Sequence, residues 1–202
     1  MPDSILFSPS PYHILSYGTL LGTTFFHVRE THPSSSIYLL KTNISQSFIN
    51  GIVAFKVLDR PHFAALQSRL FPIYFSMQTA IPVVMALTYP GSKALVGGSA
   101  SGLAGVLDAG NRWSVLAPLA TIFLTGLANM AFVGPATTKT MKDRKMQERK
   151  DGKKSYDPAP HSQEMLKLNK KFGKLHGVSS VLNLTTFIAT IIYGITLSAR
   201  IQ

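Results

Sequence analysis

Three long apolar windows that contain no charged residue constrain this chain more than any other feature. They cover residues 70–89, 113–133 and 178–198, and none of them contains Asp, Glu, Lys, Arg or His. A helix needs about 20 apolar residues to cross a hydrocarbon core about 30 Å thick, so each window is long enough. In a chain of 202 residues, too little sequence remains to wrap three such helices inside a soluble domain. The windows therefore predict three transmembrane helices.

The N-terminal region predicts a fourth, interrupted span. Two apolar pieces, residues 12–26 and 44–58, each contain about 15 residues, which is too short to cross a bilayer alone. The segment between them carries Arg29, Glu30 and Lys41, which would be costly in lipid. The two pieces form either a re-entrant or interfacial hairpin, or one transmembrane helix that is interrupted by an insertion.

Together these segments predict an all-α, multi-pass transmembrane four-helix bundle that forms a single domain over residues 1–202. Composition supports this class, because 46% of the residues are hydrophobic and only 14% are charged, which excludes a disordered chain. The absence of cysteine excludes a disulfide scaffold and a thiolate metal site. The spans are expected at about 12–58 (interrupted by an insert over 28–46), 70–89, 113–133 and 178–198.

Charge predicts the orientation of the bundle. The connection over residues 134–177 holds 12 of the 20 basic residues and five acidic ones, a net charge of +7. Connections rich in Lys and Arg face the cytoplasm, so we expect a basic cytoplasmic loop here and both termini on the opposite side. Anionic lipid headgroups are the expected partners of this loop. A nucleic-acid partner is not expected, because the charge is confined to one connection and no recognition motif accompanies it.

Residues 162–175 within this connection allow two interpretations. Met165, Leu168, Phe172 and Leu175 recur at helical spacing, while the lysines between them fall mostly on other faces. The segment is either an interfacial helix that lies on the headgroups or a plain cytoplasmic extension of the last span.

Polar residues near the cytoplasmic ends of the spans form a candidate polar cluster. Intramembrane amides usually point into the bundle, so we expect these residues to converge. The candidates are Gln67, Asn129, His176 and Asn183. Two roles remain open: interhelical hydrogen bonds that hold the helices together, or a binding site or conduction path for a polar solute or ion.

Catalytic signals are scarce. No span carries a carboxylate, the histidines lack metal-ligand spacing, and there is no GxSxG or phosphate-binding glycine loop. We therefore expect no enzymatic activity, no catalytic residues, no cofactor and no metal.

Three separated motifs resemble the transmembrane protein 205-like family, most closely its fungal branch. Residues 67–75 resemble its QSKLFPxYF signature, Pro135 lies in a segment similar to its third-helix exit, and residues 176–184 resemble its HGxSSxxNL signature. His13 resembles a histidine that opens the first helix. The matching residues, besides those of the polar cluster, are His13, Ser68, Arg69, Phe71, Pro72, Tyr74, Pro135, Gly177 and Ser180.

The resemblance implies a four-helix membrane protein with no accepted enzymatic activity. Animal members of that family are linked with tolerance of platinum drugs and with secretory membranes. The resemblance therefore implies an endoplasmic reticulum or other endomembrane location and a role in transport or membrane traffic. Other membrane proteins, or further copies of this chain, remain open as partners.

The chain departs from this resemblance in the first helix. Removing residues 28–46 joins His27 to Ser47, yields one continuous apolar helix, and restores the family spacing between His13 and Gln67. These 19 residues correspond to a short, in-frame stretch of nucleotides. Every Val codon begins with GT and one of the two Gln codons ends in AG, as intron borders require. We hypothesise that the segment is a translated, unspliced intron.

The intron hypothesis makes a prediction about the messenger RNA. Sequencing the mature transcript across this junction is expected to show His27 followed directly by Ser47. A mature message that retains the 19 codons would contradict the hypothesis, and the first span would then be broken.

Overall fold

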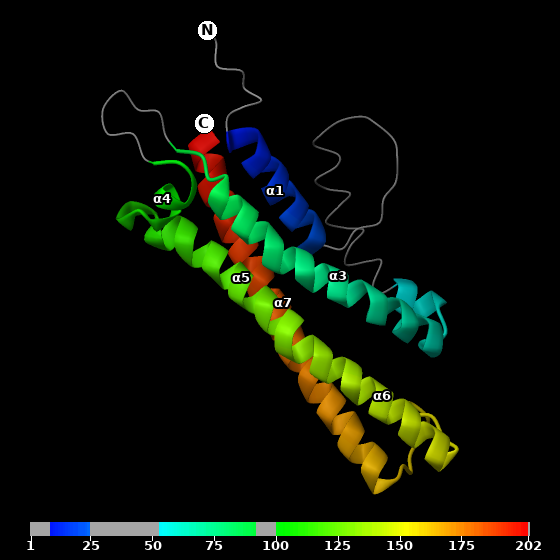
Figure 1. Cartoon of the computed structure of the whole chain (residues 1–202). Coiled ribbons are helices and arrows are strands. Elements are labelled where there is room, and N and C mark those ends of the chain that lie inside the picture. Colours follow the sequence, from blue (N-terminus) through cyan, green and yellow to red (C-terminus); the bar gives the residue numbers. More distant parts are fainter. Residues whose placement is uncertain (1–8, 25–52, 92–99, 202) are drawn as a thin grey trace.

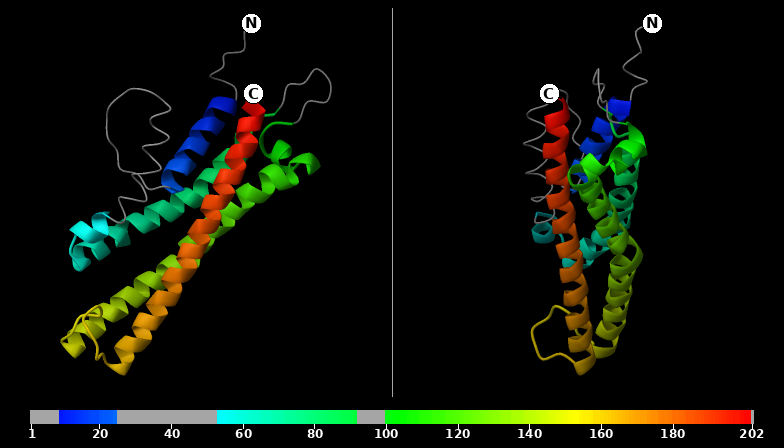
Figure 2. Two further views of the ribbon diagram at one scale, coloured as in Figure 1. Left: turned by 180° about the vertical axis from the view of Figure 1, so that it is seen from behind. Right: turned by 90° about the vertical axis from the view of Figure 1, so that its left-hand side faces the viewer.

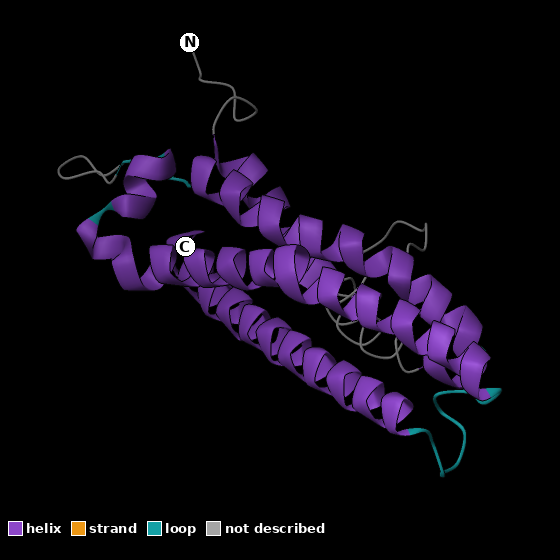
Figure 3. Cartoon of the chain, turned by 60° about the horizontal axis from the view of Figure 1, so that its bottom comes forward, coloured by secondary structure: helices purple, strands orange, loops and turns teal. Residues whose placement is uncertain are grey.

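The computed structural model describes residues 9–24, 53–91 and 100–201. Within these ranges every regular element is a helix, as Figure 3 shows. The proposed insertion over residues 28–46 lies outside the described residues. The predicted all-α class is confirmed.

Four helical elements pack together (Figure 1). In chain order they are α1 (Pro9–Thr24), α3 (Arg60–Leu87), the rod formed by α5 (Ala117–Ala128), η4 (Asn129–Val133) and α6 (Gly134–Asp151), and α7 (Gln163–Ile201). Between α3 and the rod lie the short elements α4 (Gly102–Leu107), η2 (Ala109–Asn111) and η3 (Arg112–Leu116).

Three of the described helices are long and apolar enough to cross a membrane. They are Arg60–Leu87, the continuous helix Ala109–Asp151, and Gln163–Ser198, and only 22–33% of their apolar windows is buried within the protein. Most of the apolar surface therefore faces outward, which indicates a membrane protein. The fourth helix, α1, has 16 residues and packs against α3 and α7.

The bundle exposes apolar side chains and buries polar ones. On α7 the outward face carries Val181, Leu184, Ile188 and Ile195, each at least half exposed, while Thr186 and Thr190 are fully buried. Leaving one such apolar side chain in water costs about 1.5–3 kcal/mol relative to burial. A hydrocarbon surrounding removes this cost, so the distribution fits a helix that is solvated by lipid.

The two ends of the bundle differ. The start of α1 and the ends of α3 and α7 gather at one end, while the hairpin of α6 and the first part of α7 extends from the other (Figures 1 and 2). The start of α1 and the end of α7 therefore lie at the end of the bundle away from the basic hairpin. The predicted cytoplasmic side of this hairpin stays a prediction.

The basic connection differs from the expected loop. Of residues 134–177, only 152–162 lie outside helices, because α6 continues the third span to Asp151 and α7 begins at Gln163. Gly152, with φ of 63°, ends α6 in a left-handed conformation that glycine adopts readily. Residues 163–175 extend the last span without a break, so the alternative of a separate interfacial helix is not what the structure shows.

Specific contacts hold α6 against α7 in this hairpin. Met165 and Thr140 are fully buried. The Arg144 Nε donates to Asn169 Oδ1 at 2.9 Å, and the Arg144 guanidinium lies 4.5 Å from the centroid of the Phe172 ring. The hairpin therefore has a packed interface of its own beyond the apolar spans.

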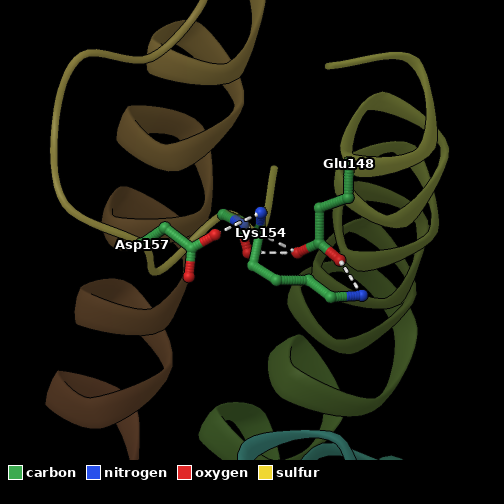
Figure 4. A network of polar contacts seen from close by, with 4 residues as sticks. Glu148, Lys154 and Asp157 are labelled. Carbon is green, nitrogen blue, oxygen red and sulfur yellow. Dashed lines mark hydrogen bonds and ion pairs between the residues drawn. The ribbon is translucent and has the colours of Figure 1, made fainter. Parts of the chain in front are cut away.

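The turn of the hairpin is organised by Glu148 (Figure 4). Its carboxylate accepts hydrogen bonds from the backbone and side chain of Ser155, and lies 3.9 Å from Lys154 Nζ. Asp157 accepts from the backbone N–H of Lys154 at 2.8 Å. Partial burial raises the pKa of Glu148, but the bonds from Ser155 and the attraction of Lys154 and Arg144 outweigh burial and lower that pKa.

Two π-helical turns, η3 directly before the rod and η4 within it, have a common cause in proline. In η3 the N–H of Ala117 bonds to the carbonyl of Arg112, and in η4 the N–H of Gly134 bonds to the carbonyl of Asn129. Each donor directly precedes a proline, Pro118 or Pro135. Proline has no N–H for the carbonyl four residues earlier and its ring clashes with it, so a wider turn accommodates the ring without breaking the helix.

Candidate functional site

The polar side chains in the middle of the bundle bond to one another across helices. Asn129 Nδ2 donates to Asn183 Oδ1 at 3.1 Å, and the hydroxyls of Thr125 and Thr186 lie 2.7 Å apart. Thr125 precedes Asn129 by one helical turn, and Thr186 follows Asn183 by nearly one turn, so the two contacts are successive rungs between the rod and α7. We call Gln78, Thr125, Asn129, Asn183 and Thr186 the polar seam.

Gln78 brings α3 to the seam. Its side chain is fully buried and donates from Nε2 to the Tyr74 hydroxyl at 2.7 Å. A Cβ on Gly126 would lie only 3.0–3.1 Å from the backbone carbonyl and Cβ of Gln78, so glycine permits the close approach of the rod to α3. Pro82 cannot donate to the Gln78 carbonyl, which leaves this oxygen without its usual helical partner at the contact.

Two side-chain amide oxygens of the seam lack hydrogen-bond partners among the described residues. They are Gln78 Oε1 and Asn129 Oδ1, and both residues are fully buried. A buried acceptor without a partner costs about 1–3 kcal/mol. The seam thus joins the rod to α7 by hydrogen bonds, with α3 packed closely against the rod at Gln78, and it leaves two buried acceptors without partners among the described residues.

The structure brings together only part of the predicted four-residue cluster. Asn129 and Asn183 are bonded directly. Gln67 is half-buried, and its Oε1 also lacks a hydrogen-bond partner. His176 is exposed and stacks on the Phe172 ring at 6.0 Å between centroids, two turns before Asn183. The expected convergence of all four residues is therefore corrected to an Asn129–Asn183 pair.

A second polar contact, at the end of the bundle where the termini lie, centres on His13. This residue is fully buried, and its Nε2 bonds to the Tyr193 hydroxyl of α7. Its Nδ1 lies 3.4 Å from Thr88 Oγ1, which itself donates to the Val84 carbonyl at 2.8 Å. Both ring nitrogens of His13 therefore have a polar partner, one on α7 and one at the end of α3.

Aromatic rings surround His13 and complete this contact. The ring of Tyr89 meets it edge to face at 5.8 Å, and Tyr17 packs on Tyr193 at 5.9 Å between centroids. One histidine near the start of α1 thereby links α1 to the end of α3 and to α7.

The other residues of the family-like motifs divide into buried and exposed groups. Tyr74 is buried and bonded to Gln78, and Phe71 stacks on Phe75 at 5.6 Å between centroids. The exposed residues are Ser68, Arg69, Pro72, Pro135, Gly177 and Ser180. Of these, Ser68 and Ser180 donate to carbonyls of their own helices.

Sequence reasoning missed several residues that the structure places at these contacts. They are Tyr17, Thr88, Tyr89, Thr186, Thr190 and Tyr193. The signal for those on α7 is the 3-4 spacing of Asn183, Thr186, Thr190, Tyr193 and Leu197, which places one residue of each turn on the same face.

Metal binding has no support among the described residues. They contain no group of three His, Cys, Asp or Glu residues that could hold a metal ion. A groove between α1 and α3 is lined mainly by apolar atoms of residues outside the seam. Its lining residues are Tyr12, Leu15, Ser16, Thr19, Ile81, Val84 and Thr88.

Comparison with known proteins gives a family and one curated relative. Residues 37–146 match the model of a domain of unknown function, DUF4149. The chain is 31% identical over 191 residues, covering 95% of this chain and 90% of the relative, to the "Xanthocillin biosynthesis cluster protein D" of Aspergillus fumigatus. No solved structure matches.

The rungs of the seam predict measurable energetic coupling. In a double-mutant cycle, Asn129→Leu and Asn183→Leu are expected to show a coupling of about 0.6 kcal/mol, the average for hydrogen bonds between membrane helices. The measurement is reversible unfolding of the full chain in bicelles. The pair Asn129→Leu and Thr190→Val, between which no bond is seen, serves as control and should show coupling near zero. Equal coupling in both cycles would contradict the assignment of the seam.

Proposed function

The chain belongs to the family defined by the domain of unknown function DUF4149, and from this membership we propose that it is a non-enzymatic, transmembrane protein 205-like membrane protein. It supports transport or membrane traffic in the endoplasmic reticulum or another endomembrane. Its basic hairpin faces the cytoplasm and both termini face the opposite side. The motifs at residues 67–75 and 176–184 support the finer family assignment.

The single observation that carries the proposal is the direct bonding within the seam. A solute path needs polar groups that face a cavity, whereas Asn129 and Asn183, and Thr125 and Thr186, bond to each other across the helix interface. Polar groups used in this way hold helices together. The bundle then acts as a stable membrane scaffold, and its exposed parts carry the interactions with other components.

The alternative is a transporter or channel component. It is favoured by Gln78 Oε1 and Asn129 Oδ1, since buried acceptors without partners could bind a polar solute or a cation. The name of the fungal relative ties that protein to a biosynthesis cluster, so a small organic solute belongs among the probes.

Flux through reconstituted vesicles separates the two functions. Three preparations are compared: vesicles with the wild-type chain, vesicles with an Asn129→Leu/Asn183→Leu variant, and empty vesicles. For each solute tested, which are protons, potassium and glycerol, we expect the same release rate from all three preparations. The matched control is Thr125→Val/Thr186→Val, which removes the neighbouring rung but keeps the amides. Flux that needs the wild-type protein, is lost in the asparagine variant and survives in the threonine variant would overturn the scaffold proposal.

A further inference from the structure

Four lysines form one exposed stripe on α7 directly before the last span. Lys167, Lys170, Lys171 and Lys174 follow the spacing i, i+3, i+4, i+7, which places them on one helix face. All four are exposed. The opposite face packs on α6 through Met165 and Phe172, so the hairpin interface fixes the direction in which the stripe points.

The acidic groups of the hairpin do little to neutralise this stripe. Glu148, Asp151 and Asp157 are held at the hairpin turn, at the far end of the hairpin from the span, by hydrogen bonds from Ser155, Gln147, Ser162 and the Lys154 backbone. Glu164 lies 3.5 Å from Lys167, but the two side chains are 60% and 74% exposed, so this pair is weak. The four lysines outnumber the one acidic residue that is paired with the stripe, so the stripe keeps a net positive charge.

The stripe starts at the depth of the lipid headgroups and extends outward from them. The apolar window begins at Val178. With a rise of 1.5 Å per residue, Lys174 is about 6 Å and Lys167 about 16 Å from that boundary along the helix. The headgroup layer is about 6 Å thick and the Debye length is about 8 Å at physiological salt, so Lys170, Lys171 and Lys174 fall within reach of anionic lipids and Lys167 lies at the edge of that reach.

The lysines near the start of α6 add to the same layer, but the cations near the hairpin turn do not. Lys139 and Lys142 are exposed about 9 Å and 13 Å beyond Val133, whereas Arg149 and Lys150 lie about 24 Å beyond it. At that distance salt screens the membrane surface from the hairpin turn. The positive charge of the hairpin thus divides into a part near the membrane and a part far from it.

We propose that the lysine stripe of α7 binds the headgroups of anionic phospholipids in the cytoplasmic leaflet. This inference rests on the cytoplasmic orientation given under the proposed function. Clusters of four or more basic residues directly cytoplasmic of a transmembrane helix attract acidic lipids. Here the packed hairpin keeps the lysines on a helix that continues the last span and does not lie flat on the membrane surface. The lysines therefore bind lipids beside the last span.

Spin-labelled lipids test the proposal in vesicles that contain the full-length protein. The fraction of motionally restricted label gives the selectivity for phosphatidylserine over phosphatidylcholine at the protein surface. We expect a several-fold preference for phosphatidylserine in the wild-type chain, falling to near equality in a Lys167→Gln/Lys170→Gln/Lys171→Gln/Lys174→Gln variant. Soluble glycerophosphoserine in excess should not displace the lipid.

A variant that removes the same number of charges from the distant part of the hairpin is the matched control. Arg149→Gln/Lys150→Gln/Lys153→Gln/Lys154→Gln is expected to retain the lipid preference. Equal loss in both variants would show a response to net charge alone and overturn the proposal, as would no preference in the wild-type chain. Displacement by glycerophosphoserine would point to a soluble phosphate ligand and also overturn it.

Orientation is measured separately from lipid selectivity. The vesicles carry the same lipids in both leaflets, so the preference does not depend on which way the chain inserts. Protease access to an epitope placed in residues 152–162, in intact microsomes, decides the side of the hairpin. A protected epitope would refute the proposed orientation without changing the lipid result. Absence of a lipid preference in the wild-type chain would refute lipid binding by the stripe without changing the orientation.

Discussion

The hydrocarbon of a bilayer offers no hydrogen bonds, and this constraint accounts for most of the architecture. Backbone groups are satisfied within helices, and polar side chains turn inward, where Asn129 meets Asn183 and Thr125 meets Thr186. Apolar side chains such as Ile188 and Ile195 face outward instead. The seam and the His13 contact are two consequences of the same rule, one in the middle of the bundle and one at the end where the termini lie.

The rod and α7 also extend beyond the apolar windows and form the basic hairpin there. Each continues past its apolar window without a break, so the packing between the apolar windows fixes the position of the basic hairpin. Arg144 binds Asn169 and Phe172 across the hairpin, and Glu148 orders its turn. A charged segment thereby becomes a rigid extension with its lysines at defined heights above the membrane.

The sequence predicts the three long apolar helices, because a long uncharged apolar window has few other solutions. It also places Asn129 and Asn183 together within a predicted cluster of four residues, since amides in spans turn inward. It does not predict that His176 is exposed and makes no contact with this pair. Where two helices pack together, part of each polar face stays outside the contact, and the sequence alone does not show which part. The charge of residues 134–177 also does not reveal that most of them are helical. The packing of these helices depends on contacts between residues far apart in sequence, such as Arg144 and Asn169, which are 25 residues apart.

The central claim is that lipid solvates the outward face of these helices, and alkaline extraction of membranes tests it most directly. Sodium carbonate at high pH strips peripheral proteins but leaves spanning helices in the bilayer. We expect the full-length chain to stay in the membrane pellet after this wash and to be released only by detergent. Recovery of the chain in the aqueous supernatant would contradict the account.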